Sequence, residues 1–208
     1  MPPSPSQDAA GAPPPTLLCR LASITDRLDL PRLFPKAQPL EVELGSGDGS
    51  FLVNLARLRP ERNFLGVERL LGRIRKMDRK GLRAGLTNLR GLRLESGYCL
   101  EYLVPPNSVS VLHLYFPDPW PKRKHWRRRL VNERFPGLAA QALAPGGVVY
   151  LRTDHAEYFA QMRAVFTASA AFRPTDTPTA LSAWPTDFER DFQAQGIQTL
   201  RAAYAKGA

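Results

Sequence analysis

One carboxylate in the sequence stands in a rigid setting that suits catalysis. The segment 116–120 has the sequence F-P-D-P-W and ends an apolar run, 109–116. Proline on each side of Asp118 keeps this residue out of a helix and stiffens the backbone around it. A carboxylate held in this way can accept hydrogen bonds from a bound group and stabilise positive charge that develops on it. We therefore take Asp118 as the candidate catalytic residue.

A dense run of cations follows this segment. Residues 122–129 have the sequence K-R-K-H-W-R-R-R, with six cations in eight positions and a tryptophan among them. Like charges so close repel each other unless an anion neutralises them, and tryptophan rings offer stacking surfaces to nucleobases. A proline turn before an ordinary charged helix is the alternative interpretation. We expect contacts to RNA phosphates from Arg123, Lys124, Arg127 and Arg128.

A glycine-rich loop indicates a second kind of site. Residues 43–49 have the sequence E-L-G-S-G-D-G between an apolar segment and a helical pattern. Glycines permit a sharp turn and close approach to a ligand, but position 50 is serine, so the spacing is not the G-x-G-x-x-G of dinucleotide sites. Glu43 would repel a pyrophosphate and suits a cationic or amine-bearing ligand, while Glu68 is placed to hold ribose hydroxyls. A glycine turn with two solvated glutamates is the alternative. The candidate binding residues are Glu43, Gly45, Gly47 and Glu68.

The periodicity of apolar residues predicts the elements that position these side chains. Strands and helices alternate, which is typical of a mostly parallel sheet with helices on both faces. Ligands of such sheets bind beyond the carboxyl ends of the strands, where 45–49, 68, 95 and 117–125 are expected to converge. The predicted strands are 40–44, 63–67, 89–94, 109–116 and 148–151. The predicted helices are 51–58, 70–86, 127–143 and one that runs from an N-cap at Asp154 to about 169.

Length and charge bound the function. The 208 residues suit a single domain, expected at 16–208, behind a disordered tail at 1–15 in which six residues are proline. The net charge is +10, and arginine provides 23 of the 29 basic residues, so a polyanionic partner such as nucleic acid is favoured over codon bias alone. The basic segment 69–83 is either a second RNA surface or only a solvated helix face.

Several function classes are excluded or disfavoured. No apolar run is long enough to span a membrane, and the N-terminus has no export signal, so we expect a cytoplasmic protein. Cys19 and Cys99 form no redox or metal spacing. His125 and His155 share no helical face with another ligand, so no metal is predicted, and His113 is expected to pack inside its apolar strand.

Two motifs together resemble a known family. F-P-D-P-W-x-K followed by H-x-x-R-R-L is similar to the signature of the bacterial tRNA (guanine-N7)-methyltransferases, and the loop at 43–49 resembles the cofactor loop of class I S-adenosylmethionine methyltransferases. The similarity extends from about 40 to 192. The resemblance implies a Rossmann-like fold with a mostly parallel seven-stranded sheet, S-adenosylmethionine as cofactor, and tRNA as partner. It further implies methyl transfer to N7 of a guanosine in the tRNA variable loop.

The same resemblance implies roles for individual residues. Asp118 corresponds to the catalytic acid and also to a cofactor-binding position, and Glu95 to a further cofactor position. The implied substrate-binding residues are Lys122, Asp154, Thr186, Asp187, Phe188 and Glu189. The chain departs from the family pattern at two of these places, because Glu95 stands where Asp or Asn is usual and Asp187 replaces the lysine of T-K-F-E.

Rival interpretations remain at this point. A methyltransferase that acts on an exocyclic amine would carry a second proline after the acid, and here Trp120 follows Pro119. An RNA-binding protein that has lost catalysis on the same scaffold would not need to bind S-adenosylmethionine. A dehydrogenase lacks its glycine pattern. The family includes monomers and dimers, so the oligomeric state, monomer or homodimer, stays open.

Overall fold

The computed structural model describes residues 15–182 and 184–207, without the side chains of Ser182, Asp187 and Phe188. The tail expected at 1–15 therefore falls almost wholly outside the described residues.

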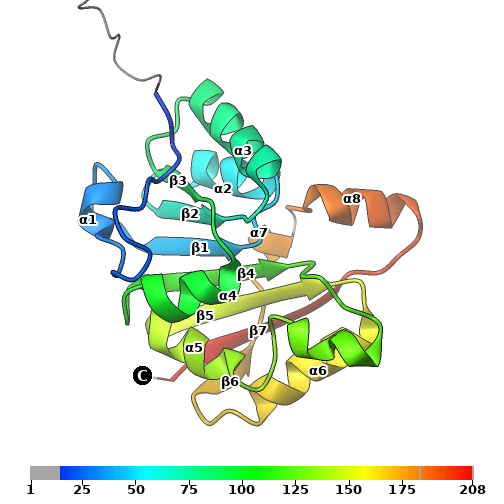
Figure 1. Cartoon of the computed structure of the whole chain (residues 1–208). Coiled ribbons are helices and arrows are strands. Elements are labelled where there is room, and N and C mark those ends of the chain that lie inside the picture. The colour runs from blue at the N-terminus through cyan, green and yellow to red at the C-terminus, as the bar shows by residue number, and fades with distance from the viewer. Residues whose placement is uncertain (1–14, 183, 208) are drawn as a thin grey trace, which may run out of the picture.

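Seven strands form one sheet in the order β3-β2-β1-β4-β5-β7-β6 (Figure 1). The first five strands in this order, β3 to β5, are parallel to one another. Strand β7 lies between β5 and β6 and is antiparallel to both. This is the fold class that the sequence predicts. The strands are β1 (Leu40–Leu44), β2 (Asn63–Val67), β3 (Leu89–Leu92), β4 (Val109–Tyr115), β5 (Leu143–Thr153), β6 (Phe172–Thr175) and β7 (Leu200–Lys206).

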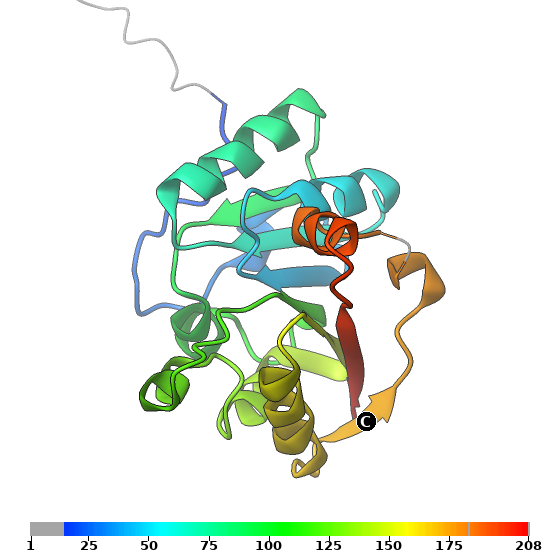
Figure 2. The same ribbon diagram turned by 90° about the vertical axis from the view of Figure 1, so that its right-hand side faces the viewer.

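Helices cover both faces of this sheet. One face carries α2 (Ser50–Leu58), α3 (Leu71–Arg83) and α7 (Thr179–Ser182). The other carries α4 (Ser96–Tyr98), the π-helical turn η1 (Cys99–Leu103), α5 (Phe135–Ala142) and α6 (Ala156–Thr167). The short α1 (Leu30–Leu33) precedes β1, and the 3₁₀ turn η2 (Arg123–Arg128) follows β4. Seen from the carboxyl ends of the parallel strands, α8 (Asp187–Ala194) lies across the front of the sheet (Figure 2).

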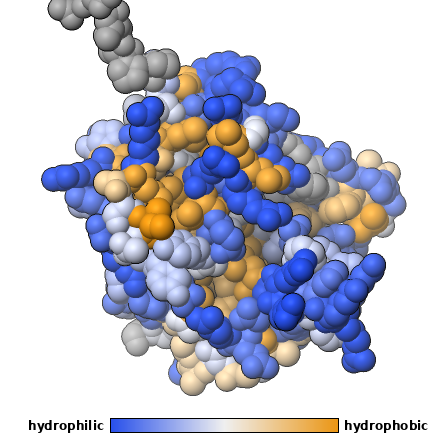
Figure 3. Space-filling model, viewed as in Figure 1, coloured by the Kyte–Doolittle hydropathy of each residue, from blue (hydrophilic) through white to orange (hydrophobic). Residues whose placement is uncertain are grey.

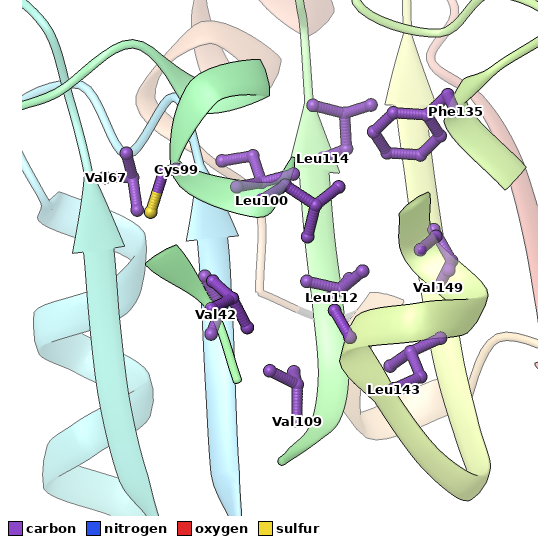
Figure 4. Close-up of a cluster of buried hydrophobic side chains, with 14 of the residues drawn as sticks. Val42, Val67, Cys99, Leu100, Val109, Leu112, Leu114, Phe135, Leu143 and Val149 are labelled. Atoms are coloured by element: carbon purple, nitrogen blue, oxygen red, sulfur yellow. The ribbon is translucent and has the colours of Figure 1, made fainter. Parts of the chain in front are cut away.

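The core has two layers because the central strands are buried on both faces. On the α5 side, Cys99 lies beside Val67, and Leu100 lies beside Leu112 and Leu114 (Figure 4). A second cluster joins α2 and α3 to the opposite face of the sheet. The two cysteines are free thiols, as expected for a chain without a disulfide framework. No helix among the described residues is long and apolar enough to cross a membrane.

A polar network interrupts this core. His113 is fully buried, and its Nε2 lies 2.8 Å from an Oε of Glu41 while its Nδ1 lies 2.8 Å from the hydroxyl of Tyr115. Arg59 and Arg62 approach the other oxygen of the same carboxylate at 2.9 and 3.0 Å. The prediction of a packed histidine in this strand is confirmed.

Two local predictions are wrong. The helix expected at 127–143 begins only at Phe135, because the preceding residues form η2 and then a series of bends and a turn, where the side chain of Arg129 is buried. The N-cap of α6 is His155, whose Nδ1 accepts a hydrogen bond from the Tyr158 amide, and Asp154 stands one residue earlier at an exposed bend. The strand expected at 148–151 is longer than predicted, since β5 starts at Leu143.

Candidate active site

The glycine loop between β1 and α2 is folded around the end of β2. Gly45, Gly47 and Gly49 have φ angles of +84°, +56° and +75°, a left-handed conformation that glycine adopts without steric cost. The amides of Gly45 and Ser46 donate hydrogen bonds to the Val67 carbonyl oxygen at 2.8 and 2.9 Å. The loop backbone is thereby fixed beside the second strand, with no side chain on its glycines to obstruct a ligand.

Glu68 connects the loop to helix α3. The Gly47 amide donates to one of its carboxylate oxygens at 3.1 Å, and the Leu70 amide donates to the other at 2.7 Å. The side chain is buried. Each carboxylate oxygen can accept more than one hydrogen bond, so a rigidly held Glu68 retains capacity for two neighbouring hydroxyl donors.

Glu43 is a buried carboxyl group without a full set of partners. It lies in β1 opposite Gly66 of β2, and its side chain is only 4% exposed. Burial raises its pKa to about 8, the carboxylates of Asp48 and Glu68 contribute in the same direction, and the guanidinium of Arg152 opposes them. Its Oε2 has no hydrogen-bond partner among the described residues. A buried acceptor of this kind suits a donor that arrives with a cationic ligand.

Glu95, the third predicted cofactor residue, follows β3 and caps α4. Its two carboxylate oxygens accept hydrogen bonds from the amides of Gly97 at 2.9 Å and Tyr98 at 2.7 Å. A carboxylate at a helix N-terminus is favourable because it satisfies amides that have no partner within the helix. The departure from Asp or Asn at this position therefore preserves an N-cap.

Asp118 lies on a strained turn at the end of β4. Phe116 and Trp120 have φ angles of +50° and +45°, which are rare for side-chain-bearing residues and are accordingly found where the surrounding structure enforces them. The carboxylate is exposed. Burial raises the pKa of Tyr158, which lies on α6, to about 12, and the negative charge of Asp118 adds to this effect. Asp118 therefore lies near α6.

A buried arginine holds this turn, and the sequence analysis missed it. Arg129 belongs to the cationic run, yet only 1% of it is exposed, and its Nε donates to the Pro119 carbonyl oxygen at 2.7 Å. The same guanidinium donates to Glu157 at 3.0 Å and to Gln161 at 2.6 Å, both on α6. Arg129 thus ties the residue after Asp118 to helix α6.

The remaining cations of the run lie at the surface. All of them are exposed, and none forms an ion pair with a described residue. The guanidinium of Arg128 lies 4.9 Å from the ring centre of Trp120, and that of Arg123 lies 5.5 Å from Trp126. These exposed residues are Lys122, Arg123, Lys124, Arg127 and Arg128.

The predicted substrate segment 186–189 is anchored to the sheet by buried charge. Thr186 and Glu189 form a capping box at the start of α8, and Glu189 accepts hydrogen bonds from Arg152 at 2.6 Å and Arg201 at 2.7 Å. Arg152 also donates to the carbonyl oxygen of Leu181 at 2.6 Å. Sequence reasoning missed Arg152 too, although a lone arginine within the apolar strand 148–153 is a visible signal.

The other predicted substrate residues have simpler surroundings. Asp154 is exposed directly after β5, at the same end of the sheet as Asp118. The side chains of Asp187 and Phe188 lie outside the described part of the chain. The sites predicted after β1, β2, β3, β4 and β5 therefore converge at the carboxyl ends of the parallel strands, the end that faces the viewer in Figure 2.

Comparison with known proteins agrees with this arrangement. Residues 37–202 match the model of a family described as "Putative methyltransferase". The chain is 36% identical to the tRNA (guanine-N(7)-)-methyltransferase of Halorhodospira halophila over 85% of this chain and 79% of that protein. It is 35% identical to the enzyme of the same name from Sodalis glossinidius, over 86% of this chain and 77% of that one. The chain belongs to the tRNA (guanine-N7)-methyltransferase family.

The fold of this methyltransferase is also found in solved structures of more distant proteins. The 16S rRNA methyltransferase KamB superimposes with a TM-score of 0.62 over 88% of this chain and 95% of that chain, at 18% identity. An identity this low supports the shared fold alone. The resemblance carried by the F-P-D-P-W and glycine-loop motifs is thus confirmed at the level of the family and of the class I methyltransferase architecture.

Proposed function

We propose that the protein transfers a methyl group from S-adenosylmethionine to N7 of a guanosine in tRNA. The observation that carries this proposal is the conjunction of two groups at one end of the sheet. One is a buried Glu43 with an oxygen that has no partner among the described residues, and the other is a rigid, exposed Asp118. Five exposed cations lie between 122 and 128, shortly after Asp118. The family to which the chain belongs supports the same reaction.

The residues around the glycine loop fit S-adenosylmethionine. Glu43 would hold the α-amino group, since its Oε2 lacks a partner among the described residues and a cation beside it would favour its ionised form. Glu68 would hold the ribose hydroxyls, and the bare backbone of Gly45 and Gly47 leaves room for the rest of the ligand. Glu95 would border the adenine. When bound, this cofactor supplies a methyl group activated by attachment to a sulfonium.

The protein's task in the reaction is alignment and charge stabilisation. Guanine N7 already carries an in-plane lone pair, so no strong base is required before attack. Holding the base at near-attack distance removes most of the entropic cost of bringing two molecules together. The purine ring becomes positively charged as the new bond forms, and the Asp118 carboxylate stabilises that charge.

Asp118 also suits the choice of base. Arginine usually recognises guanine through N7 and O6, but an arginine there would cover the atom to be methylated. Recognition must therefore come from the opposite edge, where N1–H and the exocyclic amine are donors. An exposed carboxylate accepts both. The cations from Lys122 to Arg128 would bind the phosphates around the extruded nucleotide, which we infer lies in the variable loop, as the family resemblance implies.

The experiment that tests this proposal measures methyl transfer and its position together. Unmodified tRNA is incubated with labelled S-adenosylmethionine and cleaved by borohydride and aniline, which cut at 7-methylguanosine. We expect cleavage at one guanosine, and turnover lower by about 10²- to 10³-fold in Asp118→Asn with little change in cofactor affinity. The matched control is Asp29→Asn, at an exposed aspartate that forms an ion pair with Arg32.

Each alternative gives a different result. Label incorporated without cleavage would keep the methyltransferase and contradict the N7 assignment. No incorporation, despite measurable binding of cofactor and tRNA, would favour an inactive RNA-binding scaffold. Loss of activity in Asp29→Asn equal to that in Asp118→Asn would deny Asp118 a specific role.

A further inference from the structure

Helix α3 carries a row of cations along one side. The members of this row are three or four residues apart, so they lie on one stripe of the helix, within an arc of about 80°. We call them the α3 stripe. The α3 stripe consists of Arg69, which directly precedes the helix, and of Arg73, Lys76, Lys80 and Arg83.

The charge of the α3 stripe is largely uncompensated. Lys80 donates a hydrogen bond to Asp48 at 2.6 Å, whereas the other four cations are exposed and form no ion pair with a described residue. The helix contains one acid, Asp78, which accepts hydrogen bonds from Thr16 and the Leu17 amide on another side. Like charges at this spacing destabilise a helix by a few tenths of a kcal/mol per pair.

Packing does not require these cations. The buried side of α3 is formed by Ile74, Met77 and Gly81, and the stripe residues flank it without entering the core. A surface helix that only needs solvation can mix acids with bases and gain stability from the pairs. A stripe of one sign therefore indicates an anionic partner that neutralises it.

The α3 stripe also points toward the active site. It begins at Arg69, the residue after Glu68, and its fourth member, Lys80, contacts Asp48 in the glycine loop. The stripe thus occupies the flank of α3 that adjoins the loop. Hydrophilic residues gather over α3 at the top of the molecule in Figure 3. Figure 2 shows α3 and the cationic run 123–128 on opposite sides of the strand ends.

We propose that the α3 stripe is a second phosphate-binding surface for the tRNA. This inference rests on the proposed function, because it places the target guanosine between two basic surfaces. The run 122–128 binds the backbone near that nucleotide, and α3, about 20 Å long, binds a more distant stretch of the same molecule. Because the two basic surfaces lie on opposite sides of the carboxyl ends of the strands, together they would fix the orientation of the tRNA as well as increase its affinity.

The test compares two double variants of one helix. Arg73→Gln/Lys76→Gln removes two charges from the α3 stripe. Arg75→Gln/Arg79→Gln, called the flank variant, removes two exposed charges of the same helix that lie outside the stripe. Both pairs are matched in position along the helix and in net charge, and glutamine preserves helix propensity. Binding of unmodified tRNA is measured over a range of salt concentrations, together with cofactor affinity, thermal stability and KM for tRNA.

We expect the stripe variant to bind tRNA on the order of tenfold more weakly, and its salt slope to fall by about 1.5 relative to the wild type. The flank variant should match the wild type, and cofactor affinity should not change in either. Equal losses in the two variants would overturn the inference, because the effect would then be one of net charge. An unchanged stripe variant would overturn it directly. A wild-type protein that neither binds tRNA nor forms 7-methylguanosine would refute the proposed function itself.

Discussion

The substitution Glu43→Gln tests whether the buried carboxyl group of the cofactor site lowers the free energy of unfolding of the protein. Burial raises the pKa of Glu43 from 4.5 to about 8 in the folded chain, whereas the unfolded chain releases this proton near 4.5. Between these pH values the folded state binds more protons than the unfolded state. Stability therefore falls as pH rises through this window, is unaffected by the group below about 4.5, and levels off above about 8.

The magnitude follows from the width of that window. Each pH unit inside it costs about 1.4 kcal/mol, so the full window from 4.5 to about 8 corresponds to at most about 5 kcal/mol. Glutamine has nearly the same shape and no proton to lose. We expect Glu43→Gln to be more stable than the wild type by an amount that grows with pH and becomes constant above about pH 8.

Urea unfolding without cofactor, at about pH 5.5, 7 and 8.5, provides the assay. Titrating groups that do not interact with residue 43 cancel in the difference in free energy of unfolding, which therefore reports this carboxyl group together with its coupling to Asp48, Glu68 and Arg152. Glu133→Gln, at an exposed glutamate, is the matched control and should show a difference independent of pH. A constant gap between Glu43→Gln and the wild type would refute the reasoning.

The ligand should reverse this order. Saturating S-adenosylhomocysteine stabilises whichever protein binds it, in proportion to the logarithm of its concentration over Kd. We expect a large gain in the wild type and a smaller one in Glu43→Gln, because only the carboxylate can form an ion pair with the amino group, whereas glutamine offers a single neutral acceptor. The pair of results would show that the same carboxyl group weakens the empty fold and strengthens the occupied one.

Two further predictions concern the supports of the site. Arg129→Lys keeps the charge but loses the planar guanidinium that contacts both Pro119 and α6. We expect kcat to fall by on the order of tenfold or more, with the Kd of the cofactor unchanged. An unaltered kcat would show that Arg129 does not position the turn for catalysis. Gly49→Ala should lower the free energy of unfolding by about 2–4 kcal/mol, since its Cβ would lie 2.1 Å from Met77 Cγ at a φ of +75°. Gly47→Ala, which meets only the backbone cost, should lose about 1 kcal/mol, and equal losses by urea unfolding would contradict this account.

The parts of the fold that the sequence predicts are those with strong local signals. The bounds of β1 and β2 were predicted at 40–44 and 63–67, where short apolar runs end at a glycine or a charged residue. The same pattern placed Glu43 in the first strand and Glu68 after the second. Both are polar residues at positions where local periodicity leaves few alternatives.

What the sequence could not reveal depends on long-range contacts. In the run 127–129, three consecutive arginines have the same local propensity, yet two are exposed and Arg129 is buried against α6, more than 25 positions away. This tertiary contact interrupts the helix that the pattern predicts. In contrast, T-D-F-E at 186–189 is a capping-box signature that the sequence does contain and that marks the start of α8. The substrate role of this segment comes only from the family resemblance.

Arg152 joins the two halves of the site electrostatically. Its guanidinium lowers the pKa of Glu43, against the larger effect of burial, and it also donates to Glu189. Although burial opposes it, hydrogen bonds from Thr186 and Arg152 keep the pKa of Glu189 below its ordinary value. Because one buried cation faces both carboxyl groups, the anchoring of α8 and the protonation of Glu43 share the same charge. Arg152 therefore supports both parts of the candidate site through the two carboxyl groups that it faces.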